Sequence, residues 1–256
     1  MAFTIALSGK GGTGKTTLSA LVVRHLTECV GGSVLAVDAD PNSNLGDLLG
    51  VKAEATIAAV REGASEIAAN LSPGMSKDRE LEYRIQQSVL EEQKFDLITM
   101  GRPEGPKCYC YVNHLLRGFL DKTTDDYRFV VIDNEAGMEH LSRRTTNDVD
   151  VLLVAAEPTI VAMEAARRIV DMSESLPIIV RRKALVLTRV PAAGVADRTR
   201  EKMAELGLEP TAEIPYDEEV YSAAANGEPV FHLAEGNATL CAVGNLLQEL
   251  LPDDMR

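Results

Sequence analysis

A glycine-rich segment near the N-terminus carries the clearest chemistry in the sequence. Residues 8–17 read Ser-Gly-Lys-Gly-Gly-Thr-Gly-Lys-Thr-Thr. Glycines let backbone N–H groups curl around phosphate oxygens, a lysine at this spacing reaches the β- and γ-phosphates, and the following threonine hydroxyl binds Mg²⁺. The segment therefore predicts a nucleotide-binding loop made of Gly9, Gly11, Gly12, Thr13, Gly14, Lys15, Thr16 and Thr17.

The residues around this loop indicate how it is held. Phe3, Ile5 and Leu7 alternate as in a strand, whereas apolar residues recur at helical spacing from Leu18 to Leu26. The loop is thus predicted to join a strand to a helix that starts at Thr16 and turns its positive end toward the phosphates. A glycine-rich turn with no ligand is the alternative, and it gives no reason for a strand before the loop and a helix after it.

Two later strands are predicted to end in carboxylates. The apolar run at 34–37 is followed by Asp38 and Asp40, and the run at 129–132 is followed by Asp133. Ligands of open parallel sheets bind at the carboxyl ends of the strands, so these acids can face the nucleotide. An apolar strand ending in aspartate, the Walker B pattern, assigns Asp133 to Mg²⁺ through water and offers the backbone N–H of Gly137 to the γ-phosphate. For Asp40 the alternative is a polar turn that caps the next helix.

The whole chain alternates between strand-like and helix-like patterns. Such alternation predicts an α/β fold with a mostly parallel sheet covered on both faces by helices. Helical segments are expected at 45–61, 78–93 and 112–120, among others, and strands at 95–100, 151–155, 184–187 and 213–217. No linker or repeat divides the sequence, so residues 1–256 are expected to form a single domain.

Composition excludes some classes of partner. The formal net charge of −13 disfavours binding to nucleic acid and to anionic membranes, and no basic run reverses it locally. The N-terminus has no secretory leader pattern, and the longest apolar run is far too short to cross a bilayer. A cytoplasmic protein is therefore expected.

Two of the four cysteines, Cys108 and Cys110, follow a segment rich in glycine and proline. That composition predicts an exposed loop, in which the pair could bind a metal ion. Because Zn²⁺ and square-planar Ni²⁺ each take four ligands, two thiolates imply a second chain that presents the same loop across a two-fold axis. A buried pair or a redox pair is the alternative. Cys29 and Cys241 lie among apolar residues and are expected in the core.

The phosphate loop carries an additional lysine, Lys10, directly after its first glycine. The sequence thereby resembles the deviant Walker A loop of the SIMIBI class, which includes MinD, ParA and the nitrogenase iron protein. The resemblance implies a three-layer P-loop NTPase fold and hydrolysis of ATP to ADP with Mg²⁺, in a homodimer where Lys10 reaches the partner's nucleotide. It also implies that Lys15 holds the phosphates, Asp40 orients the attacking water and Asp38 joins the magnesium shell.

Two segments, 101–113 and 133–141, resemble the CooC family of accessory ATPases for nickel insertion. This resemblance implies carbon monoxide dehydrogenase as the client and Ni²⁺ or Zn²⁺ at the dimer interface. The maturation ATPase of acetyl-CoA synthase shares much of the pattern and is an alternative. The base is expected at Thr188, Arg189, Pro215, Tyr216 and Asp217, although the family commonly has asparagine at the position of Thr188.

Two further functions compete with this assignment. A MinD- or ParA-type positioning ATPase would bind membrane or DNA, but the tail at 246–254 is acidic and anionic lipid would repel it. An iron–sulfur carrier like the nitrogenase iron protein could hold a cluster between paired cysteines of two chains. Visible absorption of anaerobically purified protein distinguishes the carrier from a colourless metal-binding ATPase.

Overall fold

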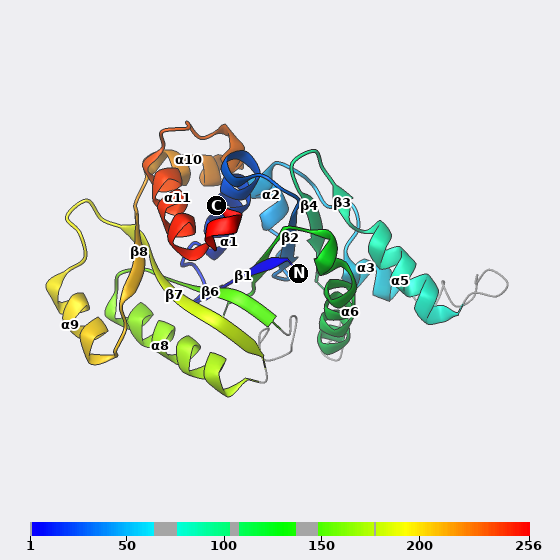
Figure 1. Ribbon diagram of the computed structural model, residues 1–256, viewed down its shortest axis with the longest axis horizontal. Helices are drawn as coiled ribbons and strands as arrows, with labels where there is room; N and C mark the ends of the chain where they lie inside the picture. The colour runs from blue at the N-terminus through cyan, green and yellow to red at the C-terminus, as the bar shows by residue number, and fades with distance from the viewer. Residues whose placement is uncertain (1, 64–75, 103–107, 137–147, 177) are drawn as a thin grey trace.

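A central sheet with helices on both faces organises the molecule (Figure 1). The computed structural model describes residues 2–63, 76–102, 108–136, 148–176 and 178–256, and for residues 108–110 it describes the backbone alone. Eight described strands form one sheet in the order β3-β4-β2-β5-β1-β6-β7-β8, and all neighbours are parallel except β3 with β4. The strands are β1 Phe3–Gly9, β2 Val34–Ala39, β3 Leu90–Glu91, β4 Asp96–Thr99, β5 Phe129–Asn134, β6 Asp148–Ala156, β7 Ile179–Val190 and β8 Pro210–Pro215. The predicted α/β class is confirmed.

The helices divide between the two faces of this sheet (Figure 1). One face is covered by α1 Lys15–His25, α2 Leu45–Leu49, α10 Glu218–Asn226 and α11 Ala238–Leu250. The other face is covered by α3 Ile57–Glu62, α5 Lys77–Gln87, α6 Cys108–Thr123, α8 Ile160–Ser175 and α9 Asp197–Glu205. Parallel neighbours require such crossover helices, which bury the strands on both sides.

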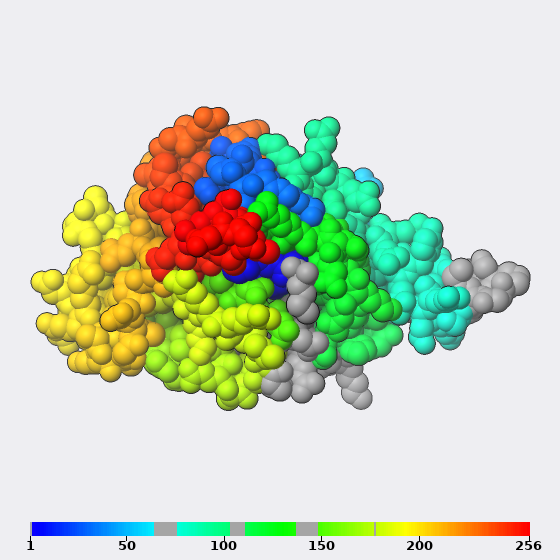
Figure 2. Space-filling model, viewed as in Figure 1, coloured from blue at the N-terminus to red at the C-terminus, as the bar shows by residue number. Residues whose placement is uncertain are grey.

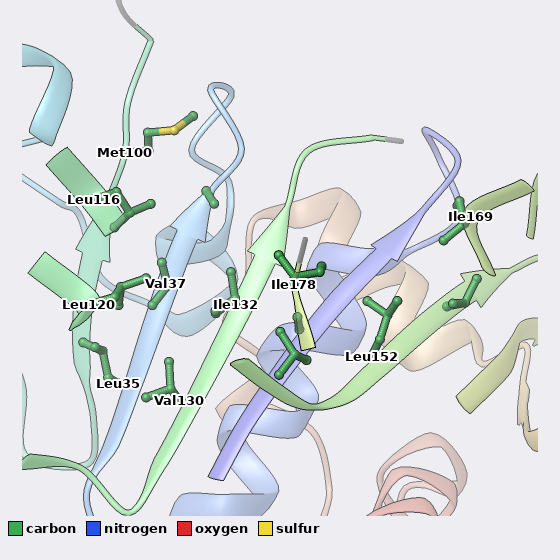
Figure 3. Close-up of a cluster of buried hydrophobic side chains, with 14 of the residues drawn as sticks. Leu35, Val37, Met100, Leu116, Leu120, Val130, Ile132, Leu152, Ile169 and Ile178 are labelled. Atoms are coloured by element: carbon green, nitrogen blue, oxygen red, sulfur yellow. The ribbon is translucent and has the colours of Figure 1, made fainter. Parts of the chain in front are cut away.

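Alternation along each strand creates two hydrophobic cores. On β5, Val130 and Ile132 belong to the core under α6 and α8, whereas Phe129 and Val131 belong to the core under α1. Figure 3 shows the first of these cores, where Leu116 and Leu120 of α6 lie over the sheet. Because side chains alternate with a period of two, the next odd-numbered residue, Asp133, faces α1. The sheet therefore aims this carboxylate at the helix that follows the phosphate loop.

The C-terminal helix is a structural part of the core. Its residues Leu240, Leu246, Leu247 and Leu250 are buried, and Figure 2 shows the C-terminal segment, in red, lying against the N-terminal part of the chain, in blue. The apolar face of α11 is thereby covered by protein. Among the described residues, no helix is long and apolar enough to cross a membrane.

Several expected boundaries were wrong. The segment 45–61 forms two short helices, α2 and α3, because Gly50 ends the first one in a left-handed conformation. The expected helix at 78–93 ends at Gln87 and is followed by β3. Helix α10 was missed, although Asp217 before Glu218 and Glu219 is a helix-start signal.

The cysteine predictions also need correction. Helix α6 begins at Cys108, four residues before the expected start, so the backbone of the Cys-x-Cys pair is helical and does not form a loop. Cys29 and Cys241 are exposed. Cys241 is flanked by Leu240 and Ala242, and Cys29 by Glu28 and Val30, but each cysteine lies on the outer side of its helical turn. The side chains of Cys108 and Cys110 lie outside the described residues, as does Gly137.

Candidate nucleotide-binding site

The phosphate loop lies at the carboxyl edge of the central strand β1, between β5 and β6. Gly9 is required by close packing, because a Cβ there would lie 2.4 Å from the carbonyl oxygen of Ala155. Gly12 and Gly14 have φ of 84° and 78°, a left-handed conformation that glycine adopts without strain. The Thr13 hydroxyl donates to the Lys10 carbonyl at 2.8 Å, which closes the turn. The loop is thus shaped by its own sequence.

Lys15 is the first residue of α1 and is 7% exposed. Its Nζ lies 3.4 Å from the Lys10 carbonyl oxygen. Burial lowers the pKa of Lys15, while the charges of Asp133, Asp40 and Glu135 act in the opposite direction. Lys15 is therefore a partly desolvated cation surrounded by carboxylates, and an anionic phosphate group suits such a position.

Asp38 and Asp133 lie beside each other on neighbouring strands. They are register partners of β2 and β5, and both are fully buried. Asp38 accepts hydrogen bonds from the backbone N–H of Leu45 at 2.9 Å and of Asp40 at 3.2 Å. Burial, with the charge of Asp133 adding to it, raises the pKa of Asp38 to about 7. Two carboxylates held this close in the core create a site of negative potential.

The hydroxyls at the start of α1 face the second of these carboxylates. Burial raises the pKa of Asp133 to about 6, and hydrogen bonds from Thr16 and Ser19 oppose that rise. The Ser19 hydroxyl donates to Asp133 Oδ1 at 3.1 Å. The other oxygen, Oδ2, is buried and has no hydrogen-bond partner in the part of the chain that the structure describes. An unpartnered carboxylate oxygen beside a threonine hydroxyl fits the oxygen chemistry that Mg²⁺ requires.

The raised pKa of Asp38 gives a testable dependence of stability on pH. The folded protein keeps a proton on Asp38 up to about pH 7, whereas the unfolded chain loses it near pH 4, so ionisation destabilises the fold as pH rises through this interval. At about 1.4 kcal/mol per pKa unit, we expect Asp38→Asn to gain stability relative to wild type by up to about 4 kcal/mol between pH 4 and pH 8. Urea unfolding in EDTA, without nucleotide, measures this difference; a pH-independent difference contradicts it.

The remaining predicted catalytic residues surround the phosphate loop. Asp40 is half-buried and close enough for its charge to act on Lys15 and Asp133. Its Oδ1 also accepts the N–H of Asn42 at 2.8 Å, so the turn role considered as an alternative is present as well. Lys10 is exposed, as are Gly11 and Gly12. The rim of the loop is therefore accessible, while Lys15 is enclosed.

One pocket collects the residues expected at the base. Thr188, Arg189, Pro215, Tyr216 and Asp217 all line it. Two of these side chains are committed to the phosphate loop: the Thr188 hydroxyl donates to the Thr13 carbonyl at 2.8 Å, and Arg189 Nη1 donates to the Gly12 carbonyl at 3.0 Å. Arg189 also pairs with Glu157 at 2.8 Å. Thr188 and Arg189 thus connect β7 to the loop.

Sequence reasoning missed the far wall of this pocket. Val220, Tyr221 and Ala224 of α10 line it together with Leu18 and Leu21 of α1. The ring of Tyr221 lies 6.3 Å from that of Tyr216, centroid to centroid, and both side chains are about half exposed. Two neighbouring aromatic rings suit a flat base. The two tyrosines are five residues apart in the sequence, with the start of α10 between them. Their proximity could have been predicted only together with this helix, which the sequence analysis missed.

Comparison with known proteins gives one family match. The family model described as the CobQ/CobB/MinD/ParA nucleotide binding domain matches residues 4–230. An uncharacterized ATP-binding protein of Methanocaldococcus jannaschii is 37% identical over 249 residues, which cover 96% of this chain and 98% of the relative. This similarity extends over nearly the whole of both chains.

A second relative is the carbon monoxide dehydrogenase accessory protein CooC of Rhodospirillum rubrum. It is 34% identical over 194 residues, which cover 68% of this chain and 70% of the relative. Among solved structures, the cell division ATPase MinD of Pyrococcus furiosus matches with a TM-score of 0.71 at 20% identity, over 97% of this chain and 98% of that one. At this identity the structural match concerns the fold.

Proposed function

Because this chain belongs to the CobQ/CobB/MinD/ParA family of nucleotide-binding domains, we propose that it is an accessory ATPase of carbon monoxide dehydrogenase. The chain binds nucleotide and hydrolyses ATP, as its family does and as its sequence predicts. The proposed specific activity is to dimerise around ATP and a metal ion, and to assist the insertion of nickel into the client enzyme. The name of the CooC relative supports the client, and the Cys-x-Cys pair supports the metal.

The observation that carries this proposal is the connection between the cysteine helix and the nucleotide strands. The segment after β4 leads into α6, which begins with Cys108. This segment starts next to the acidic pair, since the backbone N–H of Met100 donates to the Asp38 carbonyl at 2.8 Å. We infer that a change at Asp38 on nucleotide binding shifts Met100, which lies at the start of the segment before α6. Linkage between metal and nucleotide needs such a physical connection.

Each residue of the site has a separate role in the proposed phosphoryl transfer. Lys15 and the backbone N–H groups of the loop hold the phosphates. Thr16, Asp38 and Asp133 would hold Mg²⁺, which would neutralise phosphate charge. Asp40 orients the attacking water. Lys10, at the exposed rim, extends to the nucleotide of the facing protomer, where it stabilises charge on the transferred phosphoryl group. Positioning and electrostatics carry most of the catalysis.

The metal ion is the cargo of the proposed reaction. Each chain offers two thiolates, Cys108 and Cys110, and a tetrahedral Zn²⁺ or square-planar Ni²⁺ site takes four. Two protomers related by a two-fold axis supply them from identical segments.

The Cys108→Ala, Cys110→Ala variant tests the shared site. We expect it to bind ATP with unchanged affinity and to stay monomeric when Ni²⁺ or Zn²⁺ is added, because each chain has lost its half of the ligand set. Sedimentation velocity with and without metal measures this, together with metal content per chain. One metal ion per two wild-type chains is the expected stoichiometry.

The exposed cysteines provide a matched control. Cys29→Ala, Cys241→Ala also removes two thiols, but from surfaces on α11 and the end of the first helical segment. This control variant should dimerise with metal as the wild type does. If the Cys108→Ala, Cys110→Ala variant still forms dimers when metal is added, the shared site is wrong. If the control variant no longer forms dimers with metal, the metal binds adventitiously at surface thiols.

A further inference from the structure

Asp217 is the carboxylate that lines the base pocket, and its oxygens are already engaged. Oδ1 accepts the backbone N–H groups of Glu219 at 2.9 Å and Val220 at 3.2 Å, which caps α10. Oδ2 accepts the side-chain amide of Asn237 at 3.0 Å. The pocket therefore contains a carboxylate whose acceptor capacity is largely used by the protein itself.

Asn237 is the centre of this arrangement, and it does not line the pocket. It is 6% exposed. Its Nδ2 donates to Asp217 and also to Glu219 Oε2 at 2.9 Å, while its Oδ1 accepts the N–H groups of Thr239 at 3.0 Å and Leu240 at 3.2 Å. One side chain thus caps α11 and holds two carboxylates of α10 in place.

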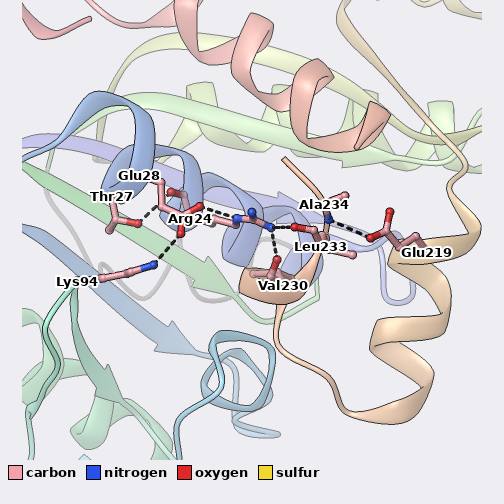
Figure 4. A network of polar contacts seen from close by, with 8 residues as sticks. All are labelled: Arg24, Thr27, Glu28, Lys94, Glu219, Val230, Leu233 and Ala234. Atoms are coloured by element: carbon pink, nitrogen blue, oxygen red, sulfur yellow. Dashed lines mark hydrogen bonds and ion pairs between the residues drawn. The ribbon is translucent and has the colours of Figure 1, made fainter. Parts of the chain in front are cut away.

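Helix α1, which follows the phosphate loop, holds the segment that contacts Glu219 in place (Figure 4). Arg24 of α1 is buried and donates to the carbonyls of Val230 at 2.5 Å and Leu233 at 3.0 Å. The next residue, Ala234, donates its N–H to Glu219 Oε1 at 3.0 Å. Both oxygens of Glu219 are therefore occupied, and turning the amide of Asn237 away would leave that buried amide without its two acceptors.

Whether a carboxylate is available decides which purine a pocket favours. Guanine presents two adjacent donors, N1–H and the N2 amino group, which match the two acceptor oxygens of a free carboxylate. Adenine presents one amino donor beside the N1 acceptor, and a carboxylate repels that acceptor. A site built around a hydrogen-bonding group discriminates strongly between such analogues.

We propose that Asn237 is a specificity-determining residue that keeps Asp217 from the base, so that the pocket favours adenine over guanine. Asn237 acts through Asp217 and is a positioning residue. This inference rests on the proposed binding of ATP at the pocket, but it does not depend on the metal, the client or dimerisation. It explains how a pocket lined by an aspartate selects adenine.

Asn237→Ser isolates this role, because serine still caps α11 while the amide donor is removed. We expect its affinity for GTP relative to ATP to rise about tenfold, which corresponds to one hydrogen-bonded pair at about 1.4 kcal/mol. Affinity for inorganic triphosphate, which has no base, is expected to stay unchanged. Calorimetric titration with the three ligands measures all of this. Asn226→Ser, at an exposed amide at the end of α10, is the matched control.

A second variant separates specificity from general damage. Adding Asp217→Asn to Asn237→Ser keeps a capping residue at 217 but removes the carboxylate, so the gain for GTP is expected to disappear. An unchanged ATP-to-GTP ratio in Asn237→Ser, with wild type binding ATP, overturns the inference; wild type that binds no ATP overturns the proposed function instead. If Asn237→Ser does not fold, Asn237→Thr, which also keeps a capping hydroxyl, takes its place in each comparison.

Discussion

We expect the Lys10→Ala variant to bind ATP as tightly as wild type and to hydrolyse it about 100- to 1000-fold more slowly. Lys10 lies at the exposed rim of the phosphate loop, whereas the enclosed cation of the loop is Lys15. Removing Lys10 therefore leaves the contacts of ground-state binding intact. It removes a charge directed at the partner's transferred phosphate, and the loss of one such electrostatic group slows a reaction about 100- to 1000-fold.

Phosphate release at saturating ATP measures this rate, and Lys52→Ala, at an exposed lysine outside the site, is the control. Mixing experiments test whether the lysine acts in trans. In a mixed dimer, a Lys15→Ala protomer still supplies its Lys10 to the intact phosphate site of a Lys10→Ala protomer. Partial recovery of hydrolysis on mixing two inactive variants is expected; no recovery means that Lys10 acts within its own chain.

The Lys15→Ala variant is expected to lose nucleotide binding itself, with Kd rising about 100-fold. Lys15 is buried beside Asp133, Asp40 and Glu135, and it is the cation that offsets them. Without it, the triphosphate meets a cluster of carboxylates with no compensating charge from this side chain. Loss of charge-assisted hydrogen bonds, at about 1.5–3 kcal/mol in all, gives a factor of this size.

Titration with a fluorescent ATP analogue in the presence of Mg²⁺ measures this affinity. Lys15→Arg keeps the charge but not the compact ammonium group, and it should bind with intermediate affinity. Nucleotide affinity of Lys15→Ala within a factor of three of wild type would contradict the assignment of Lys15 as the principal phosphate ligand. The contrast with Lys10→Ala, in which only the rate changes, separates the two lysines of one loop.

Local patterns predicted the half of the site that is continuous in sequence. The alternation before Gly9 and the helical spacing after Lys15 correctly indicated the strand, loop and helix. Asp38 and Asp133 were predicted as separate strand-end acids, but their register across β2 and β5 is a property of sheet assembly. No sequence spacing reveals that two carboxylates 95 positions apart are neighbours.

The base pocket was harder to predict because its support is non-local. Tyr216 and Asp217 could be assigned by resemblance, whereas Asn237 became relevant only when α10 and α11 were seen together. The cysteine pair shows another limit. Proline and glycine before Cys108 suggested a loop, but the helix expected at 112–120 already begins at Cys108. The bounds of elements are among the features that local composition predicts least well.

The position of β1 in the sheet affects how the chain folds. This strand is made first, yet its two neighbours are β5 and β6, so Phe3 pairs with Phe129 and Ile5 with Val151. Contacts of such high sequence separation form slowly, because a long segment must be ordered before they close. During synthesis from the N-terminus, β1 and the phosphate loop can therefore reach their final structure only after more than half of the chain, including β5 and β6, has been made. Nucleotide stabilises the completed fold and cannot act as a template for its first stages.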